Sequence, residues 1–396
     1  MASSSSAAAS ALPLAVTSIT PGAEYGYRWE PAAWPAGAQG GATSKEDAAF
    51  ASAAPVRGED PTFRGPRMAK WSPDGTMLAV AGEDNNVRVF KLQQNGVRAA
   101  RGLAVGSVRA QALVRWRSLT GHSAPVRAVA WAQTKASCTC FTAGTDSTVQ
   151  VWDLTAGRSA GNFGTRPRVI YLATSVDGRY FSAGTLDNVV SVYDAVSRRV
   201  VSCTQMPNEM NAQLWTPSGE LVIASATTGG GGGSLCRFAL ADDASDPAFS
   251  GKQAVPVRLG TAGCGLKLVS ETRVLAGAAR VLADSLSHRA LAVGGVDSCV
   301  AVMDAETEAC VRTVDAGTGA VTAAEFSHDG RFLALAARDQ AVRIVRVADG
   351  VTVSELSETV ARCVALSWNP ERLALAVLCG DDASPARLLT YFGDAP

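Results

Sequence analysis

The seven residues DSTVQVW, from Asp146 to Trp152, decide the fold, because four further stretches of the chain repeat their pattern. Each copy has an Asp, a Val three residues later, a Val or Ile five residues later and an apolar residue six residues later. The copies are DNNVRVF (84–90), DSTVQVW (146–152), DNVVSVY (187–193), DSCVAVM (297–303) and DQAVRIV (339–345). Alternate residues of a strand share one face of a sheet, so the pattern predicts a turn followed by a half-buried β-strand.

A second recurring unit lies before the first and consists of a polar turn followed by an apolar strand. Its copies are KWSPDGTMLAVAG (70–82), ATSVDGRYFSAG (173–184), LWTPSGELVIAS (214–225), FSHDGRFLALAA (326–337) and SWNPERLALAV (367–377). Pro fixes φ at one turn position and Gly supplies a positive φ at another, which makes S-P-D-G and its relatives tight turns.

The spacing of the repeats indicates the architecture. Asp146 and Asp187 are 41 residues apart, and Asp297 and Asp339 are 42 apart, which matches the ~40–45 residues of a four-stranded propeller blade. The 62 residues from Asp84 to Asp146 fit one blade plus a long connection between the first two blades. The wider gap before Asp297 fits two blades plus an insert at about 241–281. The sequence therefore predicts an all-β, seven-bladed β-propeller over residues 56–396.

Residues 1–55 differ from the rest in composition, being rich in Ala and Ser. We expect a low-complexity, largely disordered N-terminal lead. Its aromatic residues Tyr25, Tyr27, Trp29 and Trp34 could anchor one short segment on the folded body. An open sheet edge invites aggregation, so the ring must close. We expect the strand Asp60–Gly65 to complete the last blade by pairing with Arg387–Phe392.

One blade resembles the WD40 repeat closely. Its Gly121-His122, Thr142, Asp146 and Trp152 stand where WD40 repeats place a buried hydrogen-bond chain. His122 and Asp146 could also be interpreted as a catalytic pair, but this context favours a structural tetrad of His122, Thr142, Asp146 and Trp152. The other repeats keep the Asp and lose the His, so we expect their turns to be held less rigidly.

Catalytic and cofactor motifs are missing from the sequence. Only three histidines occur, and there is no G-x-S-x-G, P-loop, G-x-G-x-x-G after a strand or H-E-x-x-H. The nine cysteines are scattered, and the one close pair, Cys138 and Cys140, has no second pair or nearby His to complete a zinc site. No apolar run is long enough for a membrane helix. We therefore expect no enzyme activity, no cofactor, no metal, no small-molecule substrate and no membrane partner.

Positive charge gathers between Asp84 and Asp146, where nine Lys and Arg residues occur without one Asp or Glu. Five of them lie in the predicted connection: Arg98, Arg101, Arg109, Arg115 and Arg117. Arg suits phosphate and carboxylate partners alike, so this segment is a candidate contact for RNA or a partner protein, or else a solvated loop. Because Lys+Arg and Asp+Glu both number 36, we expect any RNA contact to be weak or indirect.

Several stretches go beyond generic WD40 and resemble the third subunit of the THO complex. They are LTGHSAPVRAVAW to YDAVSRR within 119–204, ALAVGGVDSCVAVMDAETEACVRT (290–313), AVTAAEFSHDGRFLALAARDQAVRIVRVADG (320–350), VALSWNPERLALAVLCGDD (364–382) and YFG (391–393). The opening FRG-x-x-x-x-KWSPDG (63–75) departs from that family and is similar to the telomerase Cajal-body WD40 protein.

This resemblance implies a nuclear scaffold in the complex that couples transcription to mRNA packaging and export. The propeller would dock on the large helical subunits of that complex. The alternative is a WD40 adaptor of another assembly, nuclear or cytoplasmic, such as an RNA-particle or telomerase-RNA chaperone or a ubiquitin-ligase substrate receptor.

Overall fold

The described part of the chain contains strands and turns but no helix. The computed structural model describes residues 28–31, 65–94, 111–132, 138–166, 168–226, 232–240, 258–259, 265–356, 362–380 and 387–392. The strands within these ranges form sheets whose neighbours are nearly all antiparallel. The all-β class predicted from the repeats is confirmed.

The strands form seven sheets, named blades 1 to 7 in chain order. Blade 1 holds β2 (Pro66–Trp71), β3 (Met77–Gly82), β4 (Asn86–Gln94) and β5 (Gln111–Thr120), and blade 2 holds β6 (Val126–Trp131), β7 (Thr139–Gly144), β8 (Thr148–Asp153) and β9 (Arg158–Gly164). Blade 3 holds β10 (Val169–Thr174), β11 (Tyr180–Thr185), β12 (Val189–Asp194), β13 (Arg199–Gln205) and the short β17 (Arg258–Leu259). Blade 4 holds β14 (Glu209–Trp215), β15 (Glu220–Ala226), β16 (Gly233–Leu240) and β18 (Leu266–Leu275).

The remaining blades follow the same order. Blade 5 holds β19 (Ala279–Asp284), β20 (Ala290–Gly295), β21 (Cys299–Asp304) and β22 (Cys310–Asp315), and blade 6 holds β23 (Val321–Phe326), β24 (Phe332–Ala337), β25 (Val342–Arg346) and β26 (Thr352–Leu356). Blade 7 holds β27 (Cys363–Trp368), β28 (Ala374–Cys379), β29 (Arg387–Phe392) and, on its outer edge, β1 (Arg28–Pro31).

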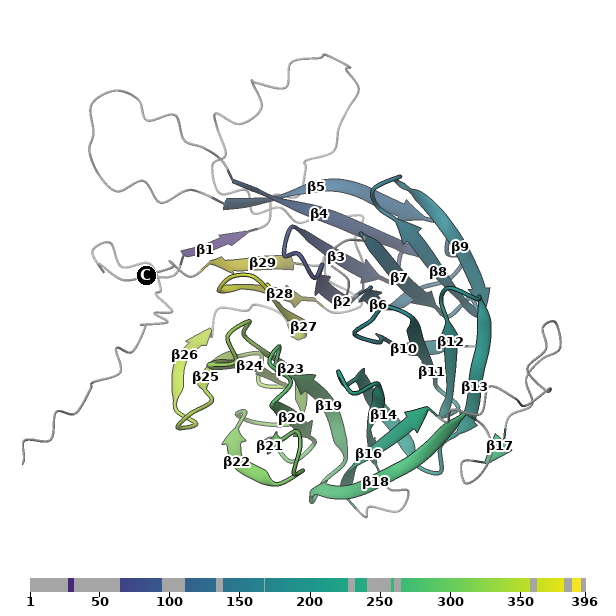
Figure 1. Cartoon of the computed structure of the whole chain (residues 1–396). Coiled ribbons are helices and arrows are strands. Elements are labelled where there is room, and N and C mark those ends of the chain that lie inside the picture. Colours follow the sequence, from purple (N-terminus) through teal and green to yellow (C-terminus); the bar gives the residue numbers. More distant parts are fainter. Residues whose placement is uncertain are drawn as a thin grey trace, which may run out of the picture.

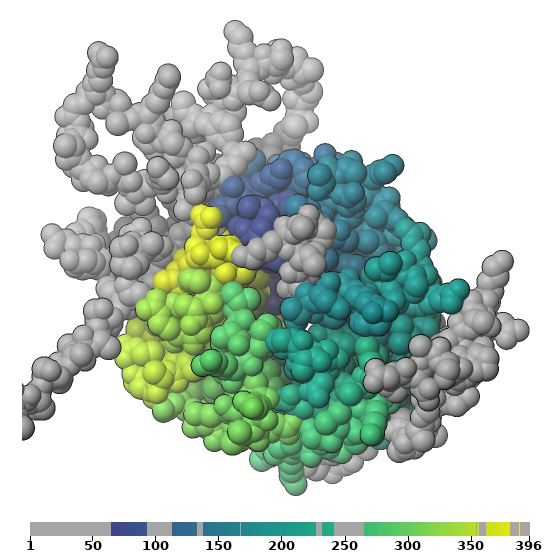
Figure 2. Space-filling model, in the orientation of Figure 1, coloured from purple at the N-terminus to yellow at the C-terminus, as the bar shows by residue number. Residues whose placement is uncertain are grey.

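The blades stand around a common centre with the first strand of each blade innermost (Figure 1). They follow one another in chain order, so that the last blade meets the first (Figure 2). Each cluster of buried apolar side chains is shared by two consecutive blades; for example, Trp71 and Leu78 of blade 1 pack with Leu378 of blade 7. This arrangement confirms the β-propeller architecture.

The repeated sequence units explain the strands. The second strands MLAVAG, FLALAA and ALAVLC are buried along their whole length, because both faces of each blade are covered by a neighbouring blade. The turns before the second strands of blades 1, 3 and 6 share one geometry: the N–H of Gly75, Gly178 or Gly330 donates to the carbonyl of the serine three residues earlier at 2.8–2.9 Å, and each glycine has a φ of 66–70°. A residue with a Cβ resists that φ, which accounts for the D-G dipeptides in the repeats.

Hydrogen bonds between the inner strands connect the ring. Trp131 Nε1 of blade 2 donates to Lys70 O of blade 1 at 2.9 Å, and Thr174 Oγ1 of blade 3 donates to Trp131 O at 2.6 Å. Trp71 Nε1 of blade 1 donates to Ser367 O of blade 7 at 3.1 Å. Some of these bonds connect blades that are neighbours in sequence, and one connects the last blade to the first. Blades 7, 1, 2 and 3 are therefore joined near the centre by side-chain hydrogen bonds as well as by apolar packing.

The predicted closing strand is wrong, although its predicted partner is right. The strand that pairs with β29 is β1, in the antiparallel register Arg28↔Phe392, and the other edge of β29 is occupied by β28. Gly65 instead belongs to blade 1, where its carbonyl accepts the N–H of Glu83 at 3.1 Å; residues 60–64 lie outside the described residues. Strand pairing depends on backbone hydrogen bonds, so the short segment RWEP can close the ring without an alternating apolar pattern.

The described part of the predicted lead is therefore β1, which includes Trp29. The rest of residues 1–55, with its Ala/Ser-rich start, lies outside the described residues. A deletion that removes β1 would remove the outer strand of blade 7.

Two predicted connections also need correction. The predicted insert at 241–281 includes β18, the outer strand of blade 4, and the start of β19, so it shrinks to about 241–265. The long connection before blade 2 instead joins β4 to β5 within blade 1. In both cases the extra residues lie between the third and fourth strands of one blade, where spacing between repeats cannot distinguish them from an interblade connection.

Candidate functional site

The structure brings the four residues of the predicted tetrad together in blade 2. His122 lies in the loop before β6, Thr142 on β7, Asp146 in the turn between β7 and β8, and Trp152 on β8. His122 Nδ1 lies 2.9 Å from Asp146 Oδ2, and His122 Nε2 lies 2.8 Å from Thr142 Oγ1. Trp152 Nε1 lies 2.8 Å from the same hydroxyl. The four side chains thus form one continuous hydrogen-bond chain.

The chemistry of its two ends sets the direction of this chain. The indole N–H of Trp152 can only donate, so Thr142 Oγ1 accepts it. The Asp146 carboxylate can only accept, so His122 Nδ1–H donates to it. The Thr142 hydroxyl proton is then free to donate to His122 Nε2, which fits a neutral imidazole. Every member is satisfied, which is the condition for a buried polar network to stabilise a fold.

Asp146 accepts further hydrogen bonds. The Ser123 N–H donates at 2.9 Å, the Thr148 N–H at 3.1 Å and the Thr148 hydroxyl at 2.8 Å. Burial by itself would raise the pKa of Asp146, but the bonds from Thr148, His122 and Ser123 outweigh burial, and the pKa lies below its ordinary value. Gly144 is required here, because a Cβ at this position would lie 2.9 Å from both Asp146 Oδ1 and His122 Nδ1.

The position of the tetrad determines what it can do. The side chain of His122 has no exposed surface and that of Asp146 is 5% exposed. Buried groups in this position do not contact a substrate. Their hydrogen bonds connect the loop before the first strand to the second and third strands. The geometry is that of a clamp inside the blade.

The corresponding Asp residues of blades 1 and 6 have a partner that the sequence reasoning missed. Arg88 Nη2 lies 2.6 Å from Asp84 Oδ2, and Arg343 Nη1 lies 2.8 Å from Asp339 Oδ2. Both arginines stand four residues after the Asp, so the signal was present in D-x-x-V-R. These turns have an ion pair where blade 2 has a histidine.

The candidate arginine segment is divided by the boundary of the described residues. Arg98, Arg101 and Arg109 lie outside them, whereas Arg115 and Arg117 lie on β5, the outer strand of blade 1. Arg115 Nη2 donates to Ser118 Oγ at 2.7 Å. The guanidinium of Arg117 lies 4.5 Å from the centre of the Trp116 ring. Both described arginines therefore make contacts within the chain.

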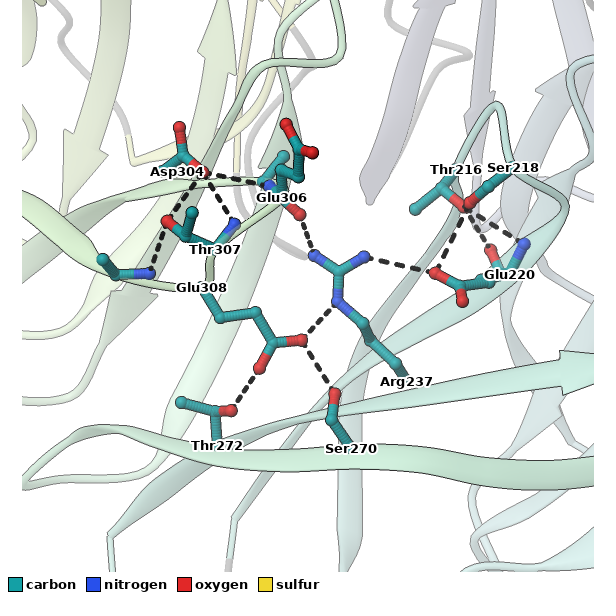
Figure 3. Close-up of polar contacts among 12 residues, drawn as sticks. Thr216, Ser218, Glu220, Arg237, Ser270, Thr272, Asp304, Glu306, Thr307 and Glu308 are labelled. Atoms are coloured by element: carbon teal, nitrogen blue, oxygen red, sulfur yellow. Dashed lines mark hydrogen bonds and ion pairs between the residues drawn. The ribbon is translucent and has the colours of Figure 1, made fainter.

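A second polar cluster, which no motif in the sequence indicates, joins blades 4 and 5 (Figure 3). Arg237 on β16 is its centre: its Nε lies 2.5 Å from Glu308 Oε1 and its Nη1 lies 3.3 Å from Glu220 Oε2. Its Nη2 donates to Ala305 O in the next blade. One guanidinium thus holds the turn of blade 5 that contains Glu308 against blade 4.

Glu308 is also bound by the outer strand of blade 4. Ser270 Oγ donates to its Oε1 at 2.7 Å, and Thr272 Oγ1 donates to its Oε2 (Figure 3). Burial would raise the pKa of Glu308, but the bonds from Thr272 and Ser270 and the charge of Arg237 lower it below its usual range. All contacts of this cluster are internal, so it fixes the angle between two blades.

The described ranges contain neither a metal-ligand cluster nor a membrane-spanning helix. No three His, Cys, Asp or Glu side chains gather there so that they could hold a metal ion. The same ranges contain no helix able to span a bilayer.

The chain carries WD40 repeats. The family described as WD domain, G-beta repeat matches residues 67–91, 114–153 and 308–345. THO complex subunit 3 of Arabidopsis thaliana is 24% identical over 315 residues, which cover 80% of this chain and 86% of that protein.

Two other relatives match over shorter lengths. WD repeat-containing protein AAC3 of Dictyostelium discoideum is 23% identical over 163 residues, covering 40% of this chain and 34% of that protein. An uncharacterized WD repeat-containing protein of Schizosaccharomyces pombe is 23% identical over 186 residues, covering 41% and 31%. The chain spans about a third of the length of these two proteins.

Proposed function

We propose that this WD40-repeat chain is a non-catalytic scaffold subunit of a THO-like complex that couples transcription to mRNA packaging and nuclear export. The observation that carries the proposal is the similarity to THO complex subunit 3, which extends over 80% of this chain and 86% of that protein. A similarity of this extent covers most of the chain, whereas the other two relatives share under half of it.

The geometry supports a scaffold. Two polar clusters, the tetrad of blade 2 and the Arg237 cluster, connect strands and blades to one another through internal bonds. A ring held in this way offers a rigid surface to several protein partners. We propose that the seven blades act as one closed ring that docks on large helical subunits in the nucleus, with RNA bound weakly or indirectly.

Affinity purification of the tagged full chain from nuclear extract, with and without ribonuclease, tests the proposal. We expect the large subunits of a THO-like complex to be recovered in both cases. A matched Leu335→Asp variant, which places a charge at a fully buried position of β24, should lose them all. Recovery of a ubiquitin ligase, of an RNA particle of another kind, or of no stable partner would contradict the proposal.

We also propose Arg98, Arg101, Arg109, Arg115 and Arg117 as a partner contact. Changing all five to Ser should remove a partner from the purification and leave the weak RNA binding of the chain unchanged. If the segment binds phosphate instead, the same variant should flatten the salt dependence of RNA binding. No change in either measurement would show that the segment is only solvated.

A further inference from the structure

The first strand of every blade has a β-bulge at the same place. The register shifts by one residue between Pro66 and Met68 in blade 1, and equivalent shifts occur in the other first strands. A bulge leaves one residue unpaired and redirects its side chain. The bulge residues are Arg67, Arg127, Ile170, Asn211, Arg280, Thr322 and Val364.

Two further positions lie beside each bulge. The first is the residue two positions before the bulge residue. The second is the residue that faces this first residue from the turn after the second strand. Backbone bonds of 3.0–3.2 Å connect them in six blades, as in Leu186 N–H to Arg168 O; in blade 4 they are the paired residues Glu209 and Ala226. We name these three positions per blade the rim. The rim pairs are Gly65–Glu83, Pro125–Thr145, Arg168–Leu186, Glu209–Ala226, Ala278–Val296, Ala320–Arg338 and Arg362–Gly380. All lie where the inner strands begin, on one face of the ring.

The rim is basic in a chain that is neutral as a whole. It contains six arginines and two glutamates, against 36 positive and 36 negative residues in the full sequence. Arg67 and Arg127 are already bound, since both guanidinium groups contact Glu83 Oε1, at 2.5 and 3.0 Å. The other four, Arg168, Arg280, Arg338 and Arg362, are exposed. No carboxylate in the described part of the chain lies within ion-pair distance of them.

Most acidic residues beside the rim are bound elsewhere. Asp187 lies 3.9 Å from Arg166, Asp339 is paired with Arg343, and Asp297 accepts the N–H of Gly277 at 3.4 Å. Glu209 is the exposed acid of the rim itself. Among the rim positions, the four exposed arginines outnumber the one exposed glutamate, so the rim itself carries a net positive charge.

The rim also offers apolar contact points and no aromatic residue. Leu186 is 55% exposed and Val296 is 39% exposed, and both occupy the turn position of their blades. Single-stranded nucleic acid is usually bound by basic grooves with aromatic side chains on which bases stack. Arginines interspersed with Leu and Val instead suit a peptide that alternates acidic and apolar side chains.

We propose that the rim of blades 3, 5, 6 and 7 binds an acidic segment of a partner protein that also carries apolar side chains. This inference deepens the proposed scaffold function, on which it rests, by naming the chemistry of one partner. Arg168, Arg280, Arg338 and Arg362 bind the carboxylates of that segment, and Leu186 and Val296 contact its apolar side chains.

Fluorescence anisotropy with the full chain tests the inference. The probe is a short labelled peptide of alternating Glu and Leu; the comparison probes are its Gln-Leu counterpart and a short oligouridine. In the rim variant, Arg168, Arg280, Arg338 and Arg362 are all changed to Gln. The control variant changes four exposed arginines off the rim to Gln: Arg158, Arg199, Arg273 and Arg289.

We expect the rim variant to bind the Glu-Leu peptide at least about ten-fold more weakly than the parent chain, since several charge pairs are lost together. The control variant, with the same change in net charge, should stay within about two-fold of the parent chain because its arginines lie off the rim. The parent chain should bind the Gln-Leu peptide weakly, and its affinity for the Glu-Leu peptide should fall with salt.

In the anisotropy experiment, three results would overturn the inference: no binding of the Glu-Leu peptide, equal weakening in both variants, or loss of oligouridine binding alone in the rim variant. The purification described above separates this inference from the proposed function. If the parent chain and the rim variant recover the same THO-like subunits, the rim inference fails and the proposed function stands. If the parent chain recovers none but peptide binding depends on the rim, the proposed function fails and the rim inference stands.

Discussion

Blades 2 and 6 hold the same turn by different means. In each, an Asp after the second strand accepts a backbone N–H from the loop before the first strand: Ser123 to Asp146 at 2.9 Å and Thr318 to Asp339 at 3.0 Å. In blade 2 a histidine connects that Asp to the blade interior. In blade 6 the Asp is paired with Arg343 at 2.8 Å, and the same guanidinium donates to Ala316 O at 2.7 Å.

The difference extends into the core. The strand register places Leu335 and Val345 of blade 6 where blade 2 has Thr142 and Trp152, and all four are buried. Blade 6 therefore needs no polar partner in its interior, and its Asp339 is bound by Arg343 near the surface. In both blades the turn contains an anchored Asp, and the anchor is a buried chain of neutral groups in blade 2 and an ion pair near solvent in blade 6.

Removing the hydroxyl of Thr142 should have the largest effect. Thr142→Val keeps the shape but leaves Trp152 Nε1–H and His122 Nε2 without partners, and each unsatisfied buried group costs about 1–3 kcal/mol. We expect the free energy of unfolding to fall by about 2–4 kcal/mol in chemical denaturation of the full chain. Thr142→Ser, which keeps the hydroxyl, should lose far less. Equal losses in the two variants would mean that the hydrogen bonds contribute nothing.

The two anchors should differ when each is removed. His122→Ala leaves the buried Thr142 hydroxyl without its acceptor, and we expect a loss of about 1–3 kcal/mol. Arg343→Met removes an ion pair near the surface, while Asp339 keeps its bonds from Thr318 and Ala341, so the loss should be below about 1 kcal/mol. Thermal melts of both variants measure the difference. A larger loss in Arg343→Met would reverse the ranking of the two anchors.

The sequence predicted what recurs in it. Alternating V-x-V positions recur five times, twice at a spacing of 41 or 42 residues, and D-G turns precede several strands, so the strands, the propeller and the positions of His122 and Trp152 could be found from these patterns. The Arg343 anchor could have been found too, because the residue four after the Asp lies beside it across the turn.

What the sequence could not predict depends on pairing between distant backbone segments or on single side chains. The closing strand β1 has the sequence RWEP, which carries no strand pattern, and its place is set by hydrogen bonds to β29. Arg237 contacts Glu308 across two blades, at 71 residues' separation, without any repeated motif. The rim arginines do not recur at one position of the repeat, since they occupy three different positions within the blades, and only the fold brings them to the same face of the ring.

Acid should weaken both anchors in the same direction. The pKa values of Asp146 and Asp339 both lie below the ordinary value, because hydrogen bonds and neighbouring charges outweigh burial. A depressed pKa in the folded state adds stability that is present above the unfolded pKa of about 3.9 and is lost as pH falls through the folded pKa. We therefore expect stability to decline below about pH 4.

The variants Asp146→Asn and Asp339→Asn should each flatten that decline, which denaturation at a series of pH values would measure. Asp146→Asn should also cost more stability at neutral pH, since its carboxylate accepts the His122 bond inside the blade. An unchanged acid limb in both variants would show that other carboxylates cause the decline.

Salt should distinguish the two anchors by the smallest effect. Arg343 and Asp339 have side chains that are 16% and 14% exposed, so dissolved ions reach their pair and screen it. Raising the salt concentration to about 1 M shortens the screening length to about 3 Å. Such an ion pair contributes at most about 1 kcal/mol. We therefore expect the stability difference between the parent chain and Arg343→Met to shrink by a few tenths of a kcal/mol. The chain from Trp152 through Thr142 to His122 is buried and is built from neutral groups up to the carboxylate, so the difference between the parent chain and His122→Ala should stay constant over the same range. Parallel denaturation curves at low and high salt measure both differences in one experiment. If salt reduced both equally, the histidine would be acting as a charged partner of Asp146, and the distinction between a neutral and an ionic anchor would be lost.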